Sequence, residues 1–197
     1  MNIVLSTRNV SKAEQIKTIF SGSLINIDTL DEAGIKGEAV EDGETLKENA
    51  FKKAIFALAF AEKGSWVMAE DTGIFIDALD GAPGIISARW AGEGKSTLEI
   101  MEYCLSKMKG IKNRKAYFET VVALVSPQGK EYFFIGKVYG ILLDTPRTAP
   151  QPSMPYSSIF IPNGQDKTWA EMSLEEENKI SHRGKAFRQA LVFLQKF

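Results

Sequence analysis

Several residue types that build common active sites are scarce in this chain of 197 residues. Cys104 is its one cysteine, which excludes an intrachain disulfide and a zinc site made of cysteines. His182 is its one histidine, which excludes metal centres built from several histidines. A metal bound to this chain would therefore need oxygen ligands, and such ligands favour magnesium or manganese.

Long apolar runs and an excess of one charge are also absent. Lysine plus arginine (24) and aspartate plus glutamate (25) nearly cancel, so no basic field exists to hold a nucleic-acid backbone. No stretch approaches the roughly 20 apolar residues of a membrane span. The apolar run at residues 3–5 is too short for a secretory signal. We therefore expect a cytoplasmic protein whose partners include neither membranes nor nucleic acid.

The order of apolar and polar segments predicts a mixed α/β fold in one domain over residues 1–197. Serine or threonine followed three residues later by glutamate marks three helix starts, at Ser11, Thr45 and Ser173. A further helix is expected over residues 96–108, and a proline-rich loop over residues 144–158. Extended segments are expected at residues 3–5, 66–69, 74–76, 116–125, 132–143 and 159–161. Strands and helices interleave at both ends of the chain around a β-rich middle.

The first candidate site is Thr7–Lys12, a polar segment between a short strand and a helix. The unpaired N–H groups and partial positive charge of a helix N-terminus suit phosphate, and Arg8 and Lys12 add full charges. The segment lacks the glycine and lysine spacing of a Walker A loop. An alternative is that Ser11 only caps the helix and Lys12 is solvated.

The second candidate site is acidic. Glu41 precedes a predicted helix, and Glu70 and Asp71 are expected to end a strand. Carboxylates on neighbouring loops and strand ends hold hard cations, which neutralise phosphate charge and acidify bound water. A free carboxylate beside them could accept a proton from that water. The alternative is that Asp71 caps a turn ahead of Gly73 and that Glu41 is merely exposed.

Three further segments carry polar side chains in suggestive places. Asn49 and Lys53 are four residues apart and share one helical face. Arg89 follows a rigid turn and could form a fork for phosphate oxygens. Ser181–Arg183 opens a helix, but the adjacency of a serine and a histidine does not give a catalytic triad. Taken singly, Asn49, Lys53 and Arg89 are more simply explained as solvated surface groups, and a lone histidine is usually structural.

Taken together, the polar motifs resemble those of the inosine triphosphate pyrophosphatase family, which removes non-standard purine nucleotides. The matching segments are Ser6–Lys12, Glu41–Ala50, Ala69–Gly73, Pro83–Arg89 and Ser181–Arg183. Each segment is weak evidence alone, whereas all of them in one order over nearly the whole chain are specific.

The resemblance implies a homodimer whose protomer has a long central mixed sheet and two lobes, with the substrate cleft between them. It implies magnesium, or manganese, held by Glu41 and Asp71, with Asp71 as the proton acceptor. The products would be a nucleoside monophosphate and pyrophosphate. The residues that would contact the substrate are Thr7, Arg8, Asn9, Lys12, Asn49, Lys53, Thr72, Arg89, Tyr156, Ser157, Glu177, His182 and Arg183.

The segment expected to read the base departs from the family pattern. Where the family has Phe-Gly-Tyr/Trp-Asp-Pro, this chain has Met154–Ser158, and Glu177 stands where the family has a lysine. A lysine only donates hydrogen bonds, whereas an ionised glutamate only accepts them. One hypothesis is a shifted selectivity, towards a base with an amino group where inosine has a carbonyl. The alternative is that Lys179 or a backbone amide replaces the lysine and inosine or xanthosine triphosphate remains the substrate.

Two other functions fit the same residues. The altered segment at 154–158 fits a nucleotide-binding protein that no longer hydrolyses its ligand. Tyr156 could stack on any base, so a pyrophosphatase for modified pyrimidine or methylated nucleotides also fits.

Overall fold

A computed structural model describes all of residues 1–197. Seven strands form one sheet in the order β2-β1-β3-β5-β6-β7, with β4 paired to β3. The strands are β1 (Asn2–Leu5), β2 (Asn26–Thr29), β3 (Trp66–Ile76), β4 (Pro83–Gly84), β5 (Lys115–Val125), β6 (Glu131–Leu142) and β7 (Phe160–Pro162). β1 pairs in parallel with β2 and β3, whereas the remaining pairs are antiparallel, so the sheet is mixed as predicted.

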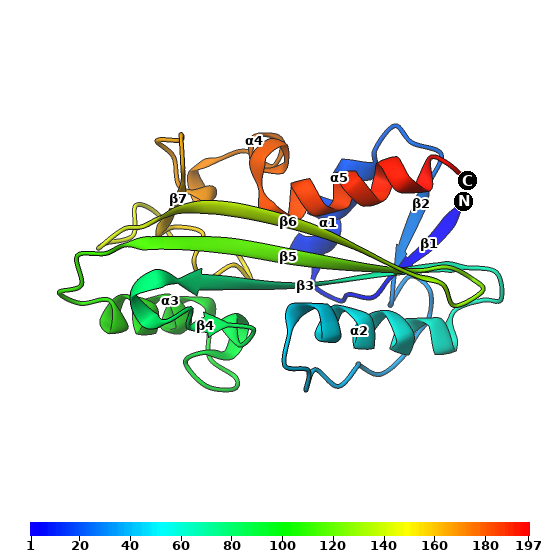
Figure 1. Cartoon of the computed structure of the whole chain (residues 1–197), viewed down its shortest axis with the longest axis horizontal. Coiled ribbons are helices and arrows are strands. Elements are labelled where there is room, and N and C mark those ends of the chain that lie inside the picture. The colour runs from blue at the N-terminus through cyan, green and yellow to red at the C-terminus, as the bar shows by residue number, and fades with distance from the viewer.

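Five α-helices cover the two faces of this sheet. They are α1 (Val10–Phe20), α2 (Leu46–Phe60), α3 (Thr97–Lys107), α4 (Leu174–Ile180) and α5 (His182–Leu194). The long strands β3, β5 and β6 run along the length of the molecule, with α2 and α3 on one side and α1, α4 and α5 on the other (Figure 1). No helix is both long and apolar enough to cross a membrane.

The long strands pass through two separately packed regions. At one end, Met68 of β3 packs with the apolar sides of α1 and α5, while the next residue, Ala69, faces α2 across the sheet. At the other end, Ile74 and Ile76 belong to a cluster that includes Phe160 of β7. Successive strand side chains point to opposite faces, so one strand can serve all of these clusters. These two regions correspond to the two lobes expected from the sequence.

Polar residues occupy the stretch of β3 between the two apolar regions. Glu70–Gly73 separates Ala69 from Ile74, and Thr120 of β5 lies opposite Thr72 in the strand register. The sequence prediction that Glu70 and Asp71 end a strand is therefore wrong, because β3 continues through both and stays paired with β5 to Ile76. The acidic residues lie in mid-strand, at the junction of the lobes.

Local capping explains several helix starts and corrects one. Thr45 accepts a hydrogen bond from the Glu48 amide at 3.1 Å, and Ser173 forms a complete capping box, both as predicted. The predicted start at Ser11 is wrong: the side chain of Asn9 caps α1 by accepting from the Lys12 amide at 3.1 Å. The helix begins two residues earlier, and its N-terminus lies inside the Thr7–Lys12 segment.

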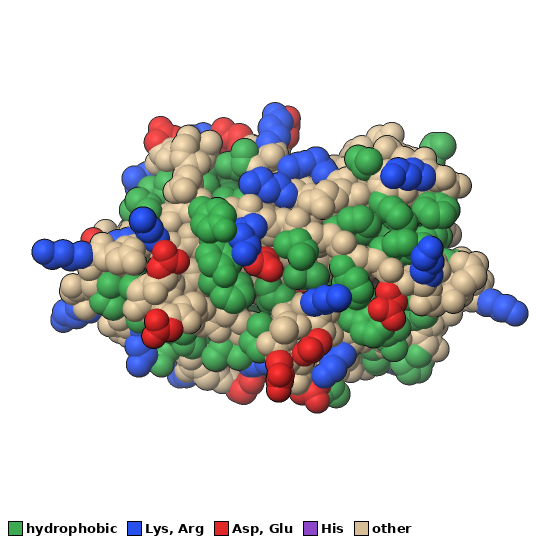
Figure 2. Space-filling view, in the orientation of Figure 1, with side chains coloured by type: hydrophobic (Ala, Val, Ile, Leu, Met, Phe, Trp, Pro, Cys, Tyr) green, Lys and Arg blue, Asp and Glu red, His purple; other side chains and the backbone are tan.

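Apart from β3, the predicted strands agree with the structure, whereas the short strands β2 and β4 were not predicted. The hairpin between β5 and β6 and the irregular segment at 144–158 are as expected. The edge strand β2 was not predicted, because its four residues Asn26–Thr29 include only one buried side chain. Lysine and arginine are interspersed with aspartate and glutamate on the face seen in Figure 2, in line with the balanced totals of charge.

Candidate active site

Two cavities meet at Lys12, which lines both of them. The larger, of about 230 Å³, lies over the N-terminus of α1 and is lined by Thr7, Arg8, Asn9, Glu41, Lys53 and Glu70, among others. The smaller, of about 90 Å³, is lined by residues of β3, β5, the 153–157 loop and the α4–α5 segment. The structure thus gathers side chains from the sequence motifs along one cleft between the lobes.

Two carboxylates share the ammonium of Lys53, a residue that lines the larger cavity together with Glu41. The Lys53 ammonium lies 3.0 Å from Asp71 Oδ1 and 3.2 Å from Glu41 Oε2. The Asn49 side chain donates to Asp71 Oδ2 at 3.3 Å and accepts from the Gly43 amide at 2.8 Å. These contacts bring together the acidic site and the Asn49–Lys53 helix face, which are separate motifs in the sequence.

The two carboxylates have the donor chemistry for magnesium. Mg²⁺ is commonly held by one or two protein carboxylates, with substrate phosphates and water completing its shell. Glu41 and Asp71 already bracket a positive charge, the Lys53 ammonium, so their side chains are placed for a cation. No group of three or more acidic, histidine or cysteine side chains is clustered here, so phosphate oxygens and water would have to supply the remaining ligands.

The environments of the two neighbouring acids differ. Burial raises the pKa of Asp71, and the adjacent Lys53 only partly offsets this effect. Burial would raise the pKa of Glu70 as well, but Arg183 and Lys12 outweigh it and hold that pKa well below its ordinary value. Glu70 is therefore held as an anion, whereas Asp71 binds a proton more readily than an exposed aspartate does.

Glu70 links the two cavities. Its carboxylate lies 2.7 Å from the Lys12 ammonium and 3.4 Å from Arg183 Nη2, and it accepts a hydrogen bond from the Thr72 hydroxyl. Thr72 in turn pairs with the Thr120 hydroxyl at 2.6 Å. The network orients Lys12 and Arg183, one from each end of the chain.

The two arginines predicted to hold phosphate lie differently from the lysines. Arg8 donates to Asp31 Oδ1 at 2.9 Å and to the carbonyls of Ile35 and Gly37 at 2.6 Å. Its guanidinium thus fastens the loop that borders the larger cavity, although the side chain also lines that cavity. Arg89 is half-exposed and donates to the Glu41 carbonyl at 3.3 Å, beside the carboxylate pair.

Aromatic side chains wall the smaller cavity. The Tyr156 hydroxyl donates to the Ser87 carbonyl at 2.8 Å, which fixes its ring in the lining. The ring of His182 stacks on Phe118, with centroids 4.7 Å apart and planes 15° apart. Burial and the nearby Arg183 hold the pKa of His182 well below its ordinary value, so its imidazole is neutral. Ser157 lines the same cavity.

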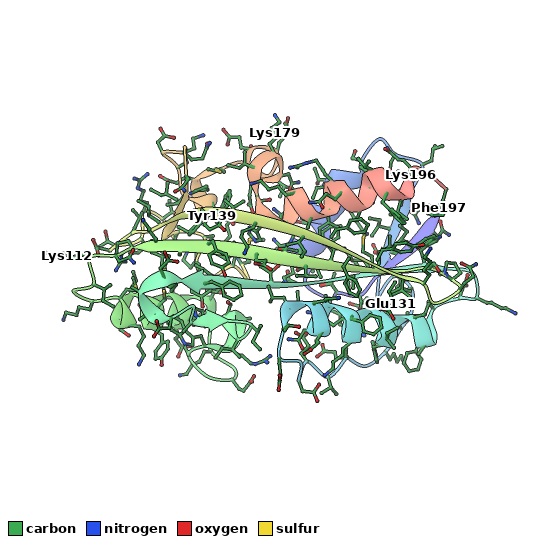
Figure 3. The ribbon with its side chains drawn as sticks, viewed as in Figure 1. Lys112, Glu131, Tyr139, Lys179, Lys196 and Phe197 are labelled. Carbon is green, nitrogen blue, oxygen red and sulfur yellow. The ribbon has the colours of Figure 1, made fainter.

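Glu177 also lines the smaller cavity and is almost wholly buried. Its Oε1 accepts a hydrogen bond from Gln15 Nε2 at 2.8 Å, and Gln15 Oε1 accepts from Arg183 Nη1 at 2.6 Å. The side chain of Lys179, by contrast, is 68% exposed and pairs with Glu175 at 2.8 Å. Figure 3 shows Lys179 at the outer edge of the molecule. Lys179 therefore does not replace the family's lysine in this cavity.

Several residues of the site were not predicted from the sequence. Gln15 lies on α1, 162 residues before Glu177, whose carboxylate it contacts. No neighbouring residue in the sequence indicates that this glutamine is buried. Phe118 was expected only as part of the extended segment 116–125, and Trp169 was not singled out, yet both line the smaller cavity. Glu70 was expected at a strand end rather than as the hub of an ion-pair network.

The fold and the cleft place the chain among α/β proteins with a site for a small anionic ligand between two lobes. Residues 3–193 match the sequence model of the Ham1 family, and the chain belongs to this family. A protein of Caldanaerobacter subterraneus named dITP/XTP pyrophosphatase is 37% identical, with 100% of this chain and 97% of the relative aligned. One of Clostridium perfringens with the same name is 38% identical, over 94% of this chain and 93% of the relative. The resemblance drawn from the motifs is confirmed.

Solved structures agree with this assignment. The Ham1 protein of Staphylococcus aureus is 32% identical, with a TM-score of 0.83 over 100% of this chain and 99% of that chain. A HAM1 protein of Coxiella burnetii is 29% identical, with a TM-score of 0.87 over the whole of both chains. The mixed sheet with two lobes is thus the fold of the family.

Proposed function

We propose that this chain is a nucleoside triphosphate pyrophosphatase that releases pyrophosphate by cleaving the bond between the α- and β-phosphates. The main support is the pair of carboxylates of Glu41 and Asp71, next to the N-terminus of α1. Both lie within 3.2 Å of one cation, the Lys53 ammonium. The names of the relatives, dITP/XTP pyrophosphatase, support this reaction on a purine nucleoside triphosphate.

The larger cavity suits the phosphates. The N-terminus of α1 offers backbone N–H groups, and Lys12 and Lys53 contribute two positive charges. Thr7 and Asn9 border the same space, and Arg8 shapes it by holding the loop at 31–38. In this proposal Lys53 shifts from the carboxylates to the phosphates when the substrate enters.

Glu41 and Asp71 would hold Mg²⁺, or Mn²⁺, together with phosphate oxygens. The bound metal would neutralise phosphate charge and acidify the attacking water. Asp71 would accept the proton of the attacking water, and Asn49 keeps its carboxylate in place. Arg89, beside Glu41, completes the positive rim of the site.

The smaller cavity would hold the base. Its lining combines aromatic walls with a few polar groups, as small-molecule sites commonly do. Thr72, Tyr156, Ser157, Glu177, His182 and Arg183 would contact the nucleoside there. We propose that the two lobes of residues 1–197 act as one catalytic unit.

We also propose that the protein works in the cytoplasm as a homodimer. The outer face of β6 carries three exposed apolar side chains, Ile135, Tyr139 and Ile141, which support a contact between copies. Tyr139 is labelled on this strand, left of the centre of the view, in Figure 3. Light scattering on the purified protein gives the mass that tests the dimer.

The experiment is pyrophosphate release from a panel of nucleoside triphosphates, each with Mg²⁺ and with chelator. The panel contains inosine, xanthosine and the four standard bases. Release that requires Mg²⁺ and is lost in Asp71→Asn supports the proposal. Binding of these nucleotides without release from any of them would point instead to a non-catalytic nucleotide-binding protein.

A further inference from the structure

The wall of the smaller cavity contains a carboxylate with one free hydrogen-bonding oxygen. Glu177 lies on α4, where Gln15 occupies Oε1, while no donor of the protein contacts Oε2. Neither a lysine nor an arginine pairs directly with this carboxylate. Arg183 reaches it only through the amide of Gln15. A ligand in the cavity therefore meets an acceptor that still requires a donor.

Donors without partners lie in the same lining. Arg183 Nε and Trp169 Nε1 are buried and make no hydrogen bond within the protein. Both are N–H groups that can only donate. The cavity thus offers Glu177 Oε2, an acceptor in the ionised carboxylate, and the unpartnered His182 Nδ1, together with donors that need acceptors from the ligand. Its polar requirements describe a molecule with at least one N–H group and at least one lone pair.

The shape and charge of the cavity select a flat base rather than a sugar or a phosphate. Phe118 and Tyr156 supply aromatic walls, which suit a planar ring. The Glu177 carboxylate repels phosphate, while Lys12, at the mouth shared with the larger cavity, attracts it. A nucleotide would therefore lie with its phosphates over α1 and its base beside Glu177.

We infer that Glu177 selects nucleotides whose base carries an exocyclic amino group facing α4, over nucleotides with a carbonyl at that position. A carbonyl oxygen at that position could not hydrogen-bond to the carboxylate oxygen, because both are acceptors, whereas an amino group donates to the carboxylate. Arg183 Nε and Trp169 Nε1 then donate hydrogen bonds to ring nitrogens or to a second carbonyl of the same base. This inference rests on the proposed pyrophosphatase function and names the base class for that site.

The test uses nucleotide pairs that exchange an amino group for a carbonyl. These are dATP with dITP and the 2,6-diaminopurine deoxynucleotide with dGTP. The kcat/KM for pyrophosphate release is measured for the wild type, Glu177→Lys and Glu177→Gln. Glu175→Lys is the matched control, because Glu175 is exposed on the same helix and lies outside the cavity. Circular dichroism melting checks that each variant is folded.

The wild type should prefer the amino member of each pair by about 10- to 100-fold, the cost of leaving a buried polar group unpaired. Glu177→Lys should reverse the preference, Glu177→Gln should reduce it, and Glu175→Lys should leave it unchanged. If Glu177→Lys does not fold, the reduced preference for the amino member in Glu177→Gln tests the inference by itself.

Two results would overturn the inference. A wild-type preference for the carbonyl member that persists in Glu177→Gln would assign base reading to other groups of the cavity. A carbonyl preference that disappears in Glu177→Gln would place the carboxylate on the adjacent ring N–H instead of on an amino group. If no nucleotide yields pyrophosphate with any variant, the proposed function itself fails, which is a distinguishable outcome.

Discussion

The phosphate end and the base end of the cleft are built on different physical principles. At the phosphate end, opposite charges lie within about 3 Å of each other, as in the contacts of Lys53 with Asp71 and of Lys12 with Glu70. At the base end, Glu177 is paired only with the neutral amide of Gln15. One region neutralises its charges before a ligand arrives, whereas the other leaves a buried carboxylate and two buried donors to be satisfied by the ligand.

This difference explains why the two ends can change independently. The phosphates and the metal are common to all nucleoside triphosphates, so the phosphate end retains the lysines and acids of the family motifs. The base differs between substrates, and there the sequence departs at Met154–Ser158 and at Glu177. Glu70 contacts side chains of both ends, through Lys12 and Arg183.

The largest effect should come from removing the proposed base at the phosphate end. Asp71→Asn should lower kcat for pyrophosphate release by about 10²- to 10⁴-fold, the usual contribution of a general base. Base preference should change little, because the base end is untouched. Asp77→Asn, an exposed acid just after the same strand, is the control. An unchanged rate in Asp71→Asn would remove this residue from the mechanism.

The next largest effect separates two neighbouring lysines of α2. Lys53 is mostly buried between Glu41 and Asp71, whereas Lys52 is exposed and pairs with Asp42. Lys53→Met should lower kcat/KM by about 10- to 100-fold, since a hydrogen bond to a charged group is worth about 1.5–3 kcal/mol. Lys52→Met should stay within about twofold. Equal losses in both variants would mean that general charge, and not position, governs phosphate binding.

The link between the two ends can be broken at Glu70. Glu70→Gln leaves Lys12 and Arg183 without their buried anion and should cost about 3–5 kcal/mol in the free energy of unfolding near neutral pH. Because the folded-state pKa of Glu70 is depressed, its stabilisation is present above the unfolded value of 4.5 and is lost as the pH falls below it. Denaturant melts should therefore show that the difference in the free energy of unfolding between wild type and Glu70→Gln becomes smaller below about pH 4.5.

A control for this variant is Glu131→Gln. Glu131 is exposed at the start of β6, and its side chain makes no hydrogen bond or ion pair, so its replacement should change stability by less than about 0.5 kcal/mol. A gap between wild type and Glu70→Gln that stays constant from pH 7 to pH 3 would contradict the assignment of Glu70 as a fixed anion.

The smallest expected effect concerns Arg8. Its three hydrogen bonds to the loop at 31–38 predict that Arg8→Lys lowers the free energy of unfolding by about 1–2 kcal/mol, because lysine cannot reproduce the fork. The KM for nucleotides should rise by less than tenfold. A KM that rises tenfold while the melting temperature is unchanged would make Arg8 a phosphate ligand rather than an anchor of the loop.

Local signals in the sequence predicted much of the fold. Thr45 and Ser173 cap helices through contacts three residues away, and apolar runs marked most of the strands. The error at Glu70 and Asp71 has a physical reason: a polar pair inside a strand looks like a strand end unless the partner strand is known. Only the pairing of β3 with β5 shows that the strand continues through both residues.

The site residues that lie within the family motifs were predicted from the sequence. Family resemblance, and not local pattern, joined Lys53 to Asp71 and placed Glu177 near the base. Gln15 could not be found in this way, because its role depends on Glu177 and Arg183, which follow it by more than 160 residues. Lys179, an alternative partner for the base from sequence, is excluded by its exposure and its pairing with Glu175.

The most direct test of the central claim identifies the products of hydrolysis. The wild-type protein is incubated with a nucleoside triphosphate and Mg²⁺, and the products are followed by phosphorus NMR. Our account predicts nucleoside monophosphate and pyrophosphate in equal amounts, with no product in Asp71→Asn. Nucleoside diphosphate and orthophosphate would show cleavage of the outer phosphate bond and would contradict the proposed pyrophosphatase.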